Sequence, residues 1–137
     1  MDLSEKMDYR DSITRNYAVD LASQFEGEFN VKQVCSIFDY TYNNWKYVND
    51  PNDSEYFAKA SESIYNGLKG DCDDFAMVLA ATIRAIGGDT QLTLAFNIIS
   101  GHAYAEVMIP VTWGDINAVK YVIIKFYKAI GKRLKAS

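Results

Sequence analysis

The sequence predicts a single α+β domain over residues 1–137. N-terminal helices are followed by a central cysteine-bearing helix packed on a small antiparallel sheet, and then by a C-terminal helix. Three observations predict this class. Apolar residues recur at helical spacing through the first 86 residues, alternate with polar residues in two stretches between 91 and 109, and return to helical spacing after 115. With 137 residues, 49% of them hydrophobic, the chain is long enough to bury one core.

The N-terminal half is predicted to be helical. A first helix is expected over residues 7–25, because large apolar residues follow at intervals of four positions: Ile13, Tyr17, Leu21 and Phe25. Asn30 is a suitable N-cap for a second helix from Val31 to Val48. Cys35 lies on the apolar face of this helix, so we expect it to be a small buried core residue. A polar loop at Asn49–Asp53 and a short helix at Ala58–Tyr65 follow.

The central helix is predicted from Cys72 to Ile86, ending at Gly87-Gly88. Its alanines and large apolar residues cover most of its circumference, which is typical of a helix enclosed on most sides. Alternating apolar residues predict strands at 91–96 and 102–109, joined by a turn at Ser100-Gly101. The last helix is expected over 116–130.

Composition excludes several classes of function. The formal net charge of −4 leaves no general basic surface for phosphates, so nucleic acid is not an expected partner. No apolar run reaches the eighteen residues that a membrane span needs, and no apolar segment of a secretion signal follows Met1. We therefore expect a cytoplasmic protein without a membrane partner. Two cysteines do not form a disulfide framework, and we expect both to be free.

Two stretches carry chemistry. In Gly70-Asp71-Cys72-Asp73-Asp74, the cysteine opens a buried helix, whose N-terminal amides favour a thiolate and can stabilise an oxyanion. In Gly101–Val107, His102 is the only histidine of the protein and stands at the start of a strand, where it could take the thiol proton. Taken alone, each of three features more often has a structural role than a catalytic one: a helix-start cysteine, a histidine after a turn and an acidic cluster that caps a helix. Their order along the chain is what favours a site.

The stretches GDCDDFAMVLAATIRAIGGDTQLTLAF and GHAYAEV resemble the core of the transglutaminase-like superfamily over residues 65–109. The segment from Trp45 to Pro51 is similar to the loop that precedes this core in prokaryotic members. The resemblance implies a papain-like fold and a Cys-His-Asp triad, with Cys72 as nucleophile and His102 as base. Members include transglutaminases, cysteine peptidases, amidases and inactive domains.

The third member of the triad is where the sequence departs from the family pattern. Asp115, in Trp113-Gly114-Asp115, has nearly the spacing in sequence that the third residue has in the family. It also suits the N-cap of the last helix, and we favour the cap. In the family an aspartate lies on a strand after the histidine strand. The chain reaches Ser137 without such a strand, so we expect a C-terminally truncated domain.

The resemblance leaves two functions open. The leading one is a thiol-dependent amide hydrolase or acyltransferase acting on a protein or peptide; the alternative is a non-catalytic or truncated binding or scaffold domain. No cofactor is required. Asp71, Asp73 and Asp74 resemble the acidic residues beside the nucleophile of calcium-dependent relatives and could supply part of a calcium site. An open sheet edge or the last helix could also support a homodimer.

Overall fold

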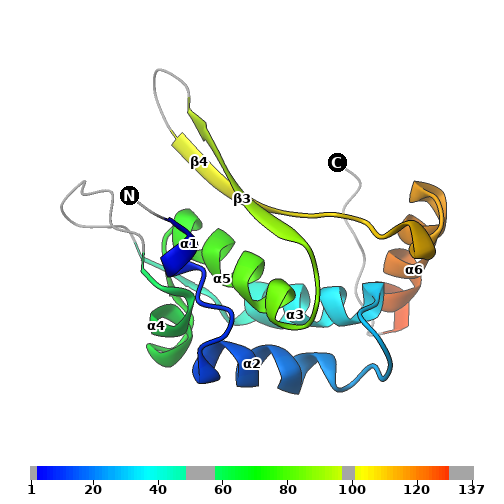
Figure 1. Cartoon of the computed structure of the whole chain (residues 1–137), viewed down its shortest axis with the longest axis horizontal. Helices are drawn as coiled ribbons and strands as arrows, with labels where there is room; N and C mark the ends of the chain where they lie inside the picture. Colours follow the sequence, from blue (N-terminus) through cyan, green and yellow to red (C-terminus); the bar gives the residue numbers. More distant parts are fainter. Residues whose placement is uncertain (1–2, 49–57, 97–100, 130–137) are drawn as a thin grey trace.

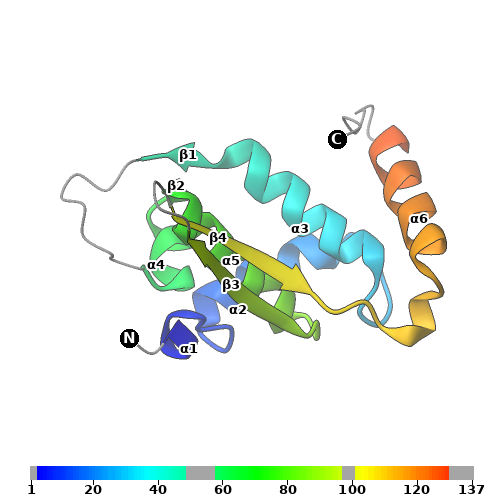
Figure 2. The ribbon, with the colours of Figure 1, turned by 90° about the horizontal axis from the view of Figure 1, so that it is seen from above.

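The computed structural model describes residues 3–48, 58–96 and 101–129, without the side chains of residues 3, 93–96 and 101–104. Helices α2, α3 and α5 form a layer, and the β3–β4 hairpin lies over α5 on the opposite side from α2 (Figure 1). Seen from above, α3 flanks α5 and α6 lies beyond α3 at one end of the molecule (Figure 2). The α+β class predicted from the sequence is confirmed.

The N-terminal helices begin at side-chain caps. After a short α1 at Leu3–Lys6, helix α2 spans Ser12–Ala22, because the Asp11 carboxylate accepts the Ile13 N–H at 2.9 Å and fixes its start. The predicted start at residue 7 was therefore wrong by one turn and a half. Helix α3 spans Val31–Asn44, with Asn30 as the predicted cap.

Helix α3 ends four residues earlier than predicted, and the chain then forms a strand. Strand β1 (Lys46–Tyr47) pairs in parallel with β2 (Lys69–Gly70), and helix α4 (Ala60–Tyr65) lies between them in sequence. The pairing is reinforced by the Lys46 N–H, which donates to the Leu68 carbonyl at 2.8 Å. The predicted loop at Asn49–Asp53 lies outside the described residues.

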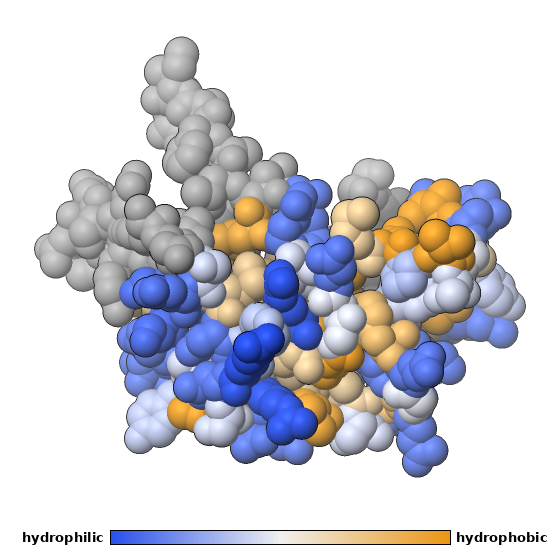
Figure 3. Space-filling model, viewed as in Figure 1, coloured by the Kyte–Doolittle hydropathy of each residue, from blue (hydrophilic) through white to orange (hydrophobic). Residues whose placement is uncertain are grey.

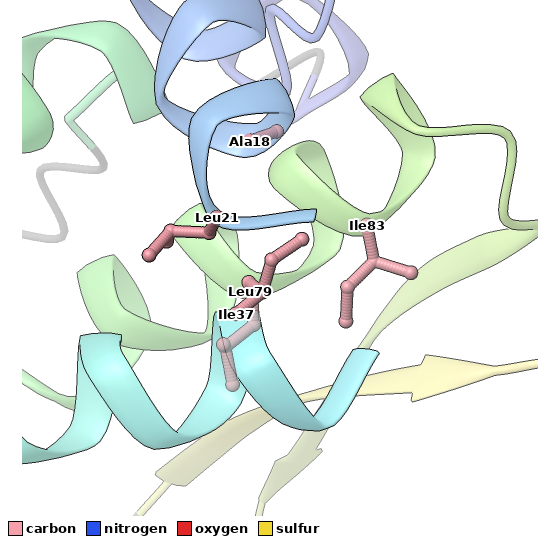
Figure 4. Close-up of a cluster of buried hydrophobic side chains, with 5 residues drawn as sticks. All are labelled: Ala18, Leu21, Ile37, Leu79 and Ile83. Atoms are coloured by element: carbon pink, nitrogen blue, oxygen red, sulfur yellow. The ribbon is translucent and has the colours of Figure 1, made fainter. Parts of the chain in front are cut away.

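Helix α5 (Cys72–Ala85) is the centre of the domain, with eight consecutive residues buried from Ala76 to Ile83. Its apolar side chains meet those of α2 and α3 in one core cluster, shown in Figure 4: Ala18, Leu21, Ile37, Leu79 and Ile83. The helix is held from several sides, since α2, α3, α4, β3 and β4 all contact it. The prediction of an enclosed central helix is confirmed.

The hairpin consists of β3 (Thr90–Phe96) and β4 (Gly101–Val107), paired antiparallel with Thr90 opposite Val107 and Ala95 opposite His102. Ala105 and Val107 pack against the core cluster, which fixes β4 on α5. Both ribbon views show β4 running in the same direction as α5, with its first residues above the N-terminal end of the helix (Figures 1 and 2).

The C-terminal part closes one end of the molecule. A 3₁₀ turn, η1 (Val111–Trp113), leads to α6 (Ile116–Ala129), which packs on α3 through Val119, Phe126 and Tyr127. Figure 3 shows apolar surface gathered over α6, where Ile116, Tyr121 and Ile124 are exposed. No described helix has the length and apolar character that a bilayer crossing requires. The predicted last residue of this helix, Ile130, lies outside the described residues.

Candidate functional site

Cys72 is the first residue of α5, and a reciprocal cap fixes it there. The Asp71 carboxylate accepts the N–H groups of Asp73 and Asp74 at 3.0 and 3.1 Å. In return, the Asp74 carboxylate accepts the Asp71 N–H at 3.2 Å. This capping box satisfies three backbone donors and sets the start of the helix at the cysteine.

The surroundings of the Cys72 thiol combine opposing charges. The aligned peptides of α5 place partial positive charge at the helix N-terminus, which favours an anion. The Asp73 carboxylate lies 3.8 Å from the Cys72 sulfur, within reach of a weak S–H···O hydrogen bond. The thiol is half-buried.

Cys35, in contrast, is buried in α3, and burial raises the pKa of its thiol to about 11. Neither cysteine forms a disulfide among the described residues.

Asp74 links the start of α5 to the segment before α4. Its carboxylate accepts the Ala58 N–H at 3.2 Å as well as the Asp71 N–H. Burial raises the pKa of Asp74 to about 6, aided by the negative charge of Asp71 and opposed by the two backbone hydrogen bonds. Asp74 therefore changes charge within two residues of Cys72 under mildly acidic conditions.

Cys72 opens on a pocket of about 400 Å³ with aromatic walls. The described residues that line it are Tyr42, Trp45, Tyr47, Cys72 and Phe75. The rings pack edge to face around Phe75, with centroids 5.3 Å away for Trp45 and 6.3 Å for Tyr42. Tyr42 and Tyr47 remain largely exposed, at 63% and 64%. We call this hollow the aromatic pocket.

The β1–β2 pair positions the aromatic pocket beside the nucleophile. Trp45 donates its indole N–H to the Gly70 carbonyl at 3.1 Å, and Val48 donates its backbone N–H to the same oxygen at 2.9 Å. The pocket was not predicted from the sequence. The alternation of Trp45, Lys46 and Tyr47 was the signal that could have indicated a strand with both rings on one face.

His102 belongs to β4, where its backbone pairs with Ala95. The packing of β4 on α5 brings the strand that carries His102 against the helix that carries Cys72. The His102 side chain lies outside the described residues, so its role as a base stays a prediction.

Asp115 stands immediately before α6, and its carboxylate accepts the Ala118 N–H at 2.9 Å. Its backbone carbonyl accepts the Val119 N–H at 3.1 Å, so the residue has the N-cap position favoured from the sequence. A contact with His102 is not among the described interactions, and the triad role of Asp115 stays untested.

The three aspartates around Cys72 are engaged at the start of α5, and the calcium site expected there stays a prediction. Among the described side chains, no group of three or more His, Cys, Asp or Glu residues is arranged to hold a metal ion. The reason is visible in the cap: Asp71 and Asp74 direct their oxygens to backbone N–H groups, and Asp73 approaches the thiol. The acidic cluster is used for the start of α5.

Comparison with known proteins gives two matches. The Transglutaminase-like superfamily matches residues 15–118. A crystal structure of a putative cysteine protease from Cytophaga hutchinsonii is similar, with a TM-score of 0.54 and 25% sequence identity. The similarity covers 68% of this chain but 32% of that protein, so this chain spans about a third of that protein's length. No curated protein matches.

Proposed function

Because the chain belongs to the transglutaminase-like superfamily and has the fold of a papain-like thiol enzyme, we propose that it is an amide hydrolase or acyltransferase that works through an acyl-enzyme on Cys72. The observation that carries the proposal is the position of Cys72. It stands at the capped N-terminus of α5 and lines an open pocket, where a substrate carbonyl can approach its sulfur. A structural cysteine has no need of either feature.

The reaction has two steps. His102 takes the proton of the Cys72 thiol, and the thiolate attacks the carbonyl carbon of an amide to form a C–S bond. The C–N bond then breaks, and the leaving amine takes the proton from His102. Water or a second amine next attacks the thioester, so that the acyl group leaves as an acid or as a new amide and the thiol is restored. The packing of β4 along α5 supports this assignment of His102.

The oxyanion of each step needs hydrogen-bond donors. We assign this role to the N-terminal end of α5, whose amides, that of Cys72 among them, carry the partial positive charge of the helix. The Cys72 amide belongs to the residue that attacks, which keeps it close to the developing charge.

One observation favours the alternative, a non-catalytic binding or scaffold domain. The Oδ1 atom of Asp115 caps α6, so only the second carboxylate oxygen is left to orient an imidazole. Loss of the orienting carboxylate in a related triad lowers turnover by about 10⁴. A Cys–His pair without a third member could still form an acyl-enzyme, although slowly.

Thiol labelling tests the nucleophile. We expect iodoacetamide at pH 7.5 to modify Cys72 at least about 100-fold faster than Cys35, because the raised pKa of Cys35 leaves very little thiolate. Peptide mass spectrometry separates the two sites. Equal rates, or faster labelling of Cys35, contradict the assignment.

Acylation tests the chemistry. We expect p-nitrophenyl acetate to give a burst of p-nitrophenol and an acetyl group on Cys72. Cys72→Ser should abolish the burst, Cys35→Ser should retain it, and His102→Ala should slow it by about 100-fold or more. A burst that persists in Cys72→Ser contradicts the proposed function. A fast-labelling Cys72 that never forms an acyl-enzyme supports the binding domain instead.

A further inference from the structure

We propose that the aromatic pocket is the acyl-side subsite of the enzyme and selects substrates with an uncharged aromatic or large aliphatic side chain next to the reacting carbonyl. This inference rests on the proposed role of Cys72. It adds a substrate class, which neither the family nor the similar solved structure assigns to this chain.

The side of the scissile bond follows from the chemistry of the thioester. Cys72 is itself one of the lining residues of the pocket. In the acyl-enzyme, the acyl carbon is bonded to the Cys72 sulfur, so its substituent begins within two bonds of a pocket wall. The leaving amine departs from the same carbon and need not enter the pocket. Because the acyl group stays on the sulfur through both steps, we assign it, rather than the leaving amine, to the aromatic walls.

The walls set the chemical class of this group. All described lining residues other than Cys72 are aromatic, and none carries a charge at neutral pH. An acidic side chain that left water for these walls would lose hydration without gaining a partner. An apolar ring or branched side chain gains the burial of its own surface and of the exposed faces of Tyr42 and Tyr47. The two tyrosine hydroxyls remain available to the polar backbone of a peptide.

The pocket is built before the substrate arrives. Phe75 is held in α5, and both Trp45 and Tyr42 meet it edge to face at interplanar angles of 76° and 71°. The hydrogen bond of Trp45 to Gly70 fixes the indole, and Phe38 stacks on the ring of Tyr42 at 5.7 Å. Rings ordered in advance lose little conformational freedom on binding. A larger share of the contact free energy therefore contributes to the difference in affinity between substrates. A volume of about 400 Å³ is in the range of ligand sites and accommodates one large side chain with its carbonyl.

The test uses N-acetyl amino acid chloromethyl ketones, which present only the acyl side. The Cys72 thiolate attacks the methylene carbon, a C–S bond forms, and the C–Cl bond breaks with chloride leaving. Each inactivation rate is divided by the iodoacetamide rate of the same protein, which removes differences in thiolate reactivity. We expect the phenylalanyl reagent to exceed the alanyl reagent by about tenfold or more, and the aspartyl reagent to be slower than both.

Variants locate the preference in the pocket. Tyr47→Ala and Tyr42→Ala should each reduce the phenylalanyl-to-alanyl ratio by about threefold or more, and Tyr47→Phe should retain it. Tyr65→Ala is the matched control, because Tyr65 is 78% exposed on α4 and does not line the pocket. Far-ultraviolet circular dichroism checks that each variant folds. Both tyrosines are exposed, so either variant suffices if the other fails to fold.

The outcomes separate the two proposals. If iodoacetamide modifies Cys72 no faster than Cys35, the proposed function itself fails. If Cys72 reacts rapidly but the phenylalanyl and alanyl reagents have equal normalised rates, only the subsite inference is overturned. A preference that survives the combined Tyr42→Ala and Tyr47→Ala changes also overturns it, because the preference then arises elsewhere.

Discussion

The indole N–H of Trp45 donates a hydrogen bond of 3.1 Å to the carbonyl oxygen of Gly70, two residues before Cys72. This contact joins the segment after α3 to the start of α5, although 25 positions of sequence separate the two residues. The contact gives the Trp45 side chain two roles. Its ring forms a wall of the pocket, and its N–H ties that wall to the end of β2, just before the nucleophile.

Replacing Trp45 separates these roles. Trp45→Phe keeps a ring but removes the donor, and we expect the free energy of unfolding to fall by about 1 kcal/mol. Trp45→Ala also removes the ring contacts with Phe75 and should cost about 2–3 kcal/mol, less than a fully buried tryptophan because Trp45 is only half-buried. Urea unfolding measures both. Equal stability of the wild type and Trp45→Phe would show that the hydrogen bond contributes nothing.

Gly70 is expected to tolerate no side chain. A Cβ at this position would lie 2.6 Å from the Cβ of Asp74, and the φ of +154° is one that other residues rarely adopt. Gly70→Ala should therefore displace Asp74, loosen the capping box and lower the free energy of unfolding by about 2 kcal/mol or more.

Gly67→Ala is the matched control for Gly70→Ala. Gly67 also has a positive φ, of +91°, but a Cβ there would have nothing within 4 Å. We expect a cost of about 1 kcal/mol, from the backbone alone. Chemical denaturation compares the two variants, and an equal loss in both contradicts the steric argument for Gly70.

Asp74 should make stability depend on pH. Because burial raises its pKa from 3.8 to about 6, the folded protein holds this proton more firmly than the unfolded chain does. Its contribution is fully present below about pH 4 and is lost as the pH rises through about 6. Unfolding measured from pH 4 to 7 should show this component in the wild type and lack it in Asp74→Asn.

The cause of that shift can be tested at Asp71, whose negative charge contributes to it. Asp71→Asn keeps an oxygen for the cap but removes the charge, so the pKa of Asp74 should fall. A ¹³C NMR titration of the Asp74 carboxyl measures the change. Asp89→Asn, beyond the opposite end of α5, is the control and should leave the pKa where it was. An unchanged pKa in Asp71→Asn would exclude the charge of Asp71 as a cause.

Asp115 is expected to act as a cap. Asp115→Ala removes the acceptor of the Ala118 N–H and should lower the free energy of unfolding by about 1 kcal/mol, and Asp115→Asn should restore most of it. The iodoacetamide rate of Cys72 should be the same in all three proteins. A slower rate in both variants, with stability restored in Asp115→Asn, would assign Asp115 to the thiol site instead.

Local patterns predicted the parts of the fold that local interactions determine. The start of α5 at Cys72 was predicted correctly from its apolar pattern, and the capping box of Asp71 and Asp74 explains why the helix begins there. Asn30 marked the start of α3 as its cap. The two strands of the hairpin were predicted from alternation, to within two residues at each end. The sequence favoured a cap at Asp115, and its hydrogen bond to Ala118 shows that cap, while its triad role stays untested.

What the sequence left hidden depends on contacts between distant segments. Strands β1 and β2 have two residues each, and their parallel pairing, which joins Lys46 to Lys69, arises only through the fold. The aromatic pocket needs Tyr42 from α3, Tyr47 from β1 and Phe75 from α5 to converge. Each looks like an ordinary surface or core aromatic when taken alone.

The burial of α5 has a consequence for how the protein opens. Amides in the stretch from Ala76 to Ile83 belong to a helix that other elements contact from several sides, so they should exchange with solvent only when the whole domain unfolds. Under the proposed function, the reacting sulfur of Cys72 is thus attached about one turn away from the slowest-exchanging backbone of the chain. Because α5 is held in this way, a movement that admits a bulky ligand beside Cys72 has to come from the elements packed around the helix.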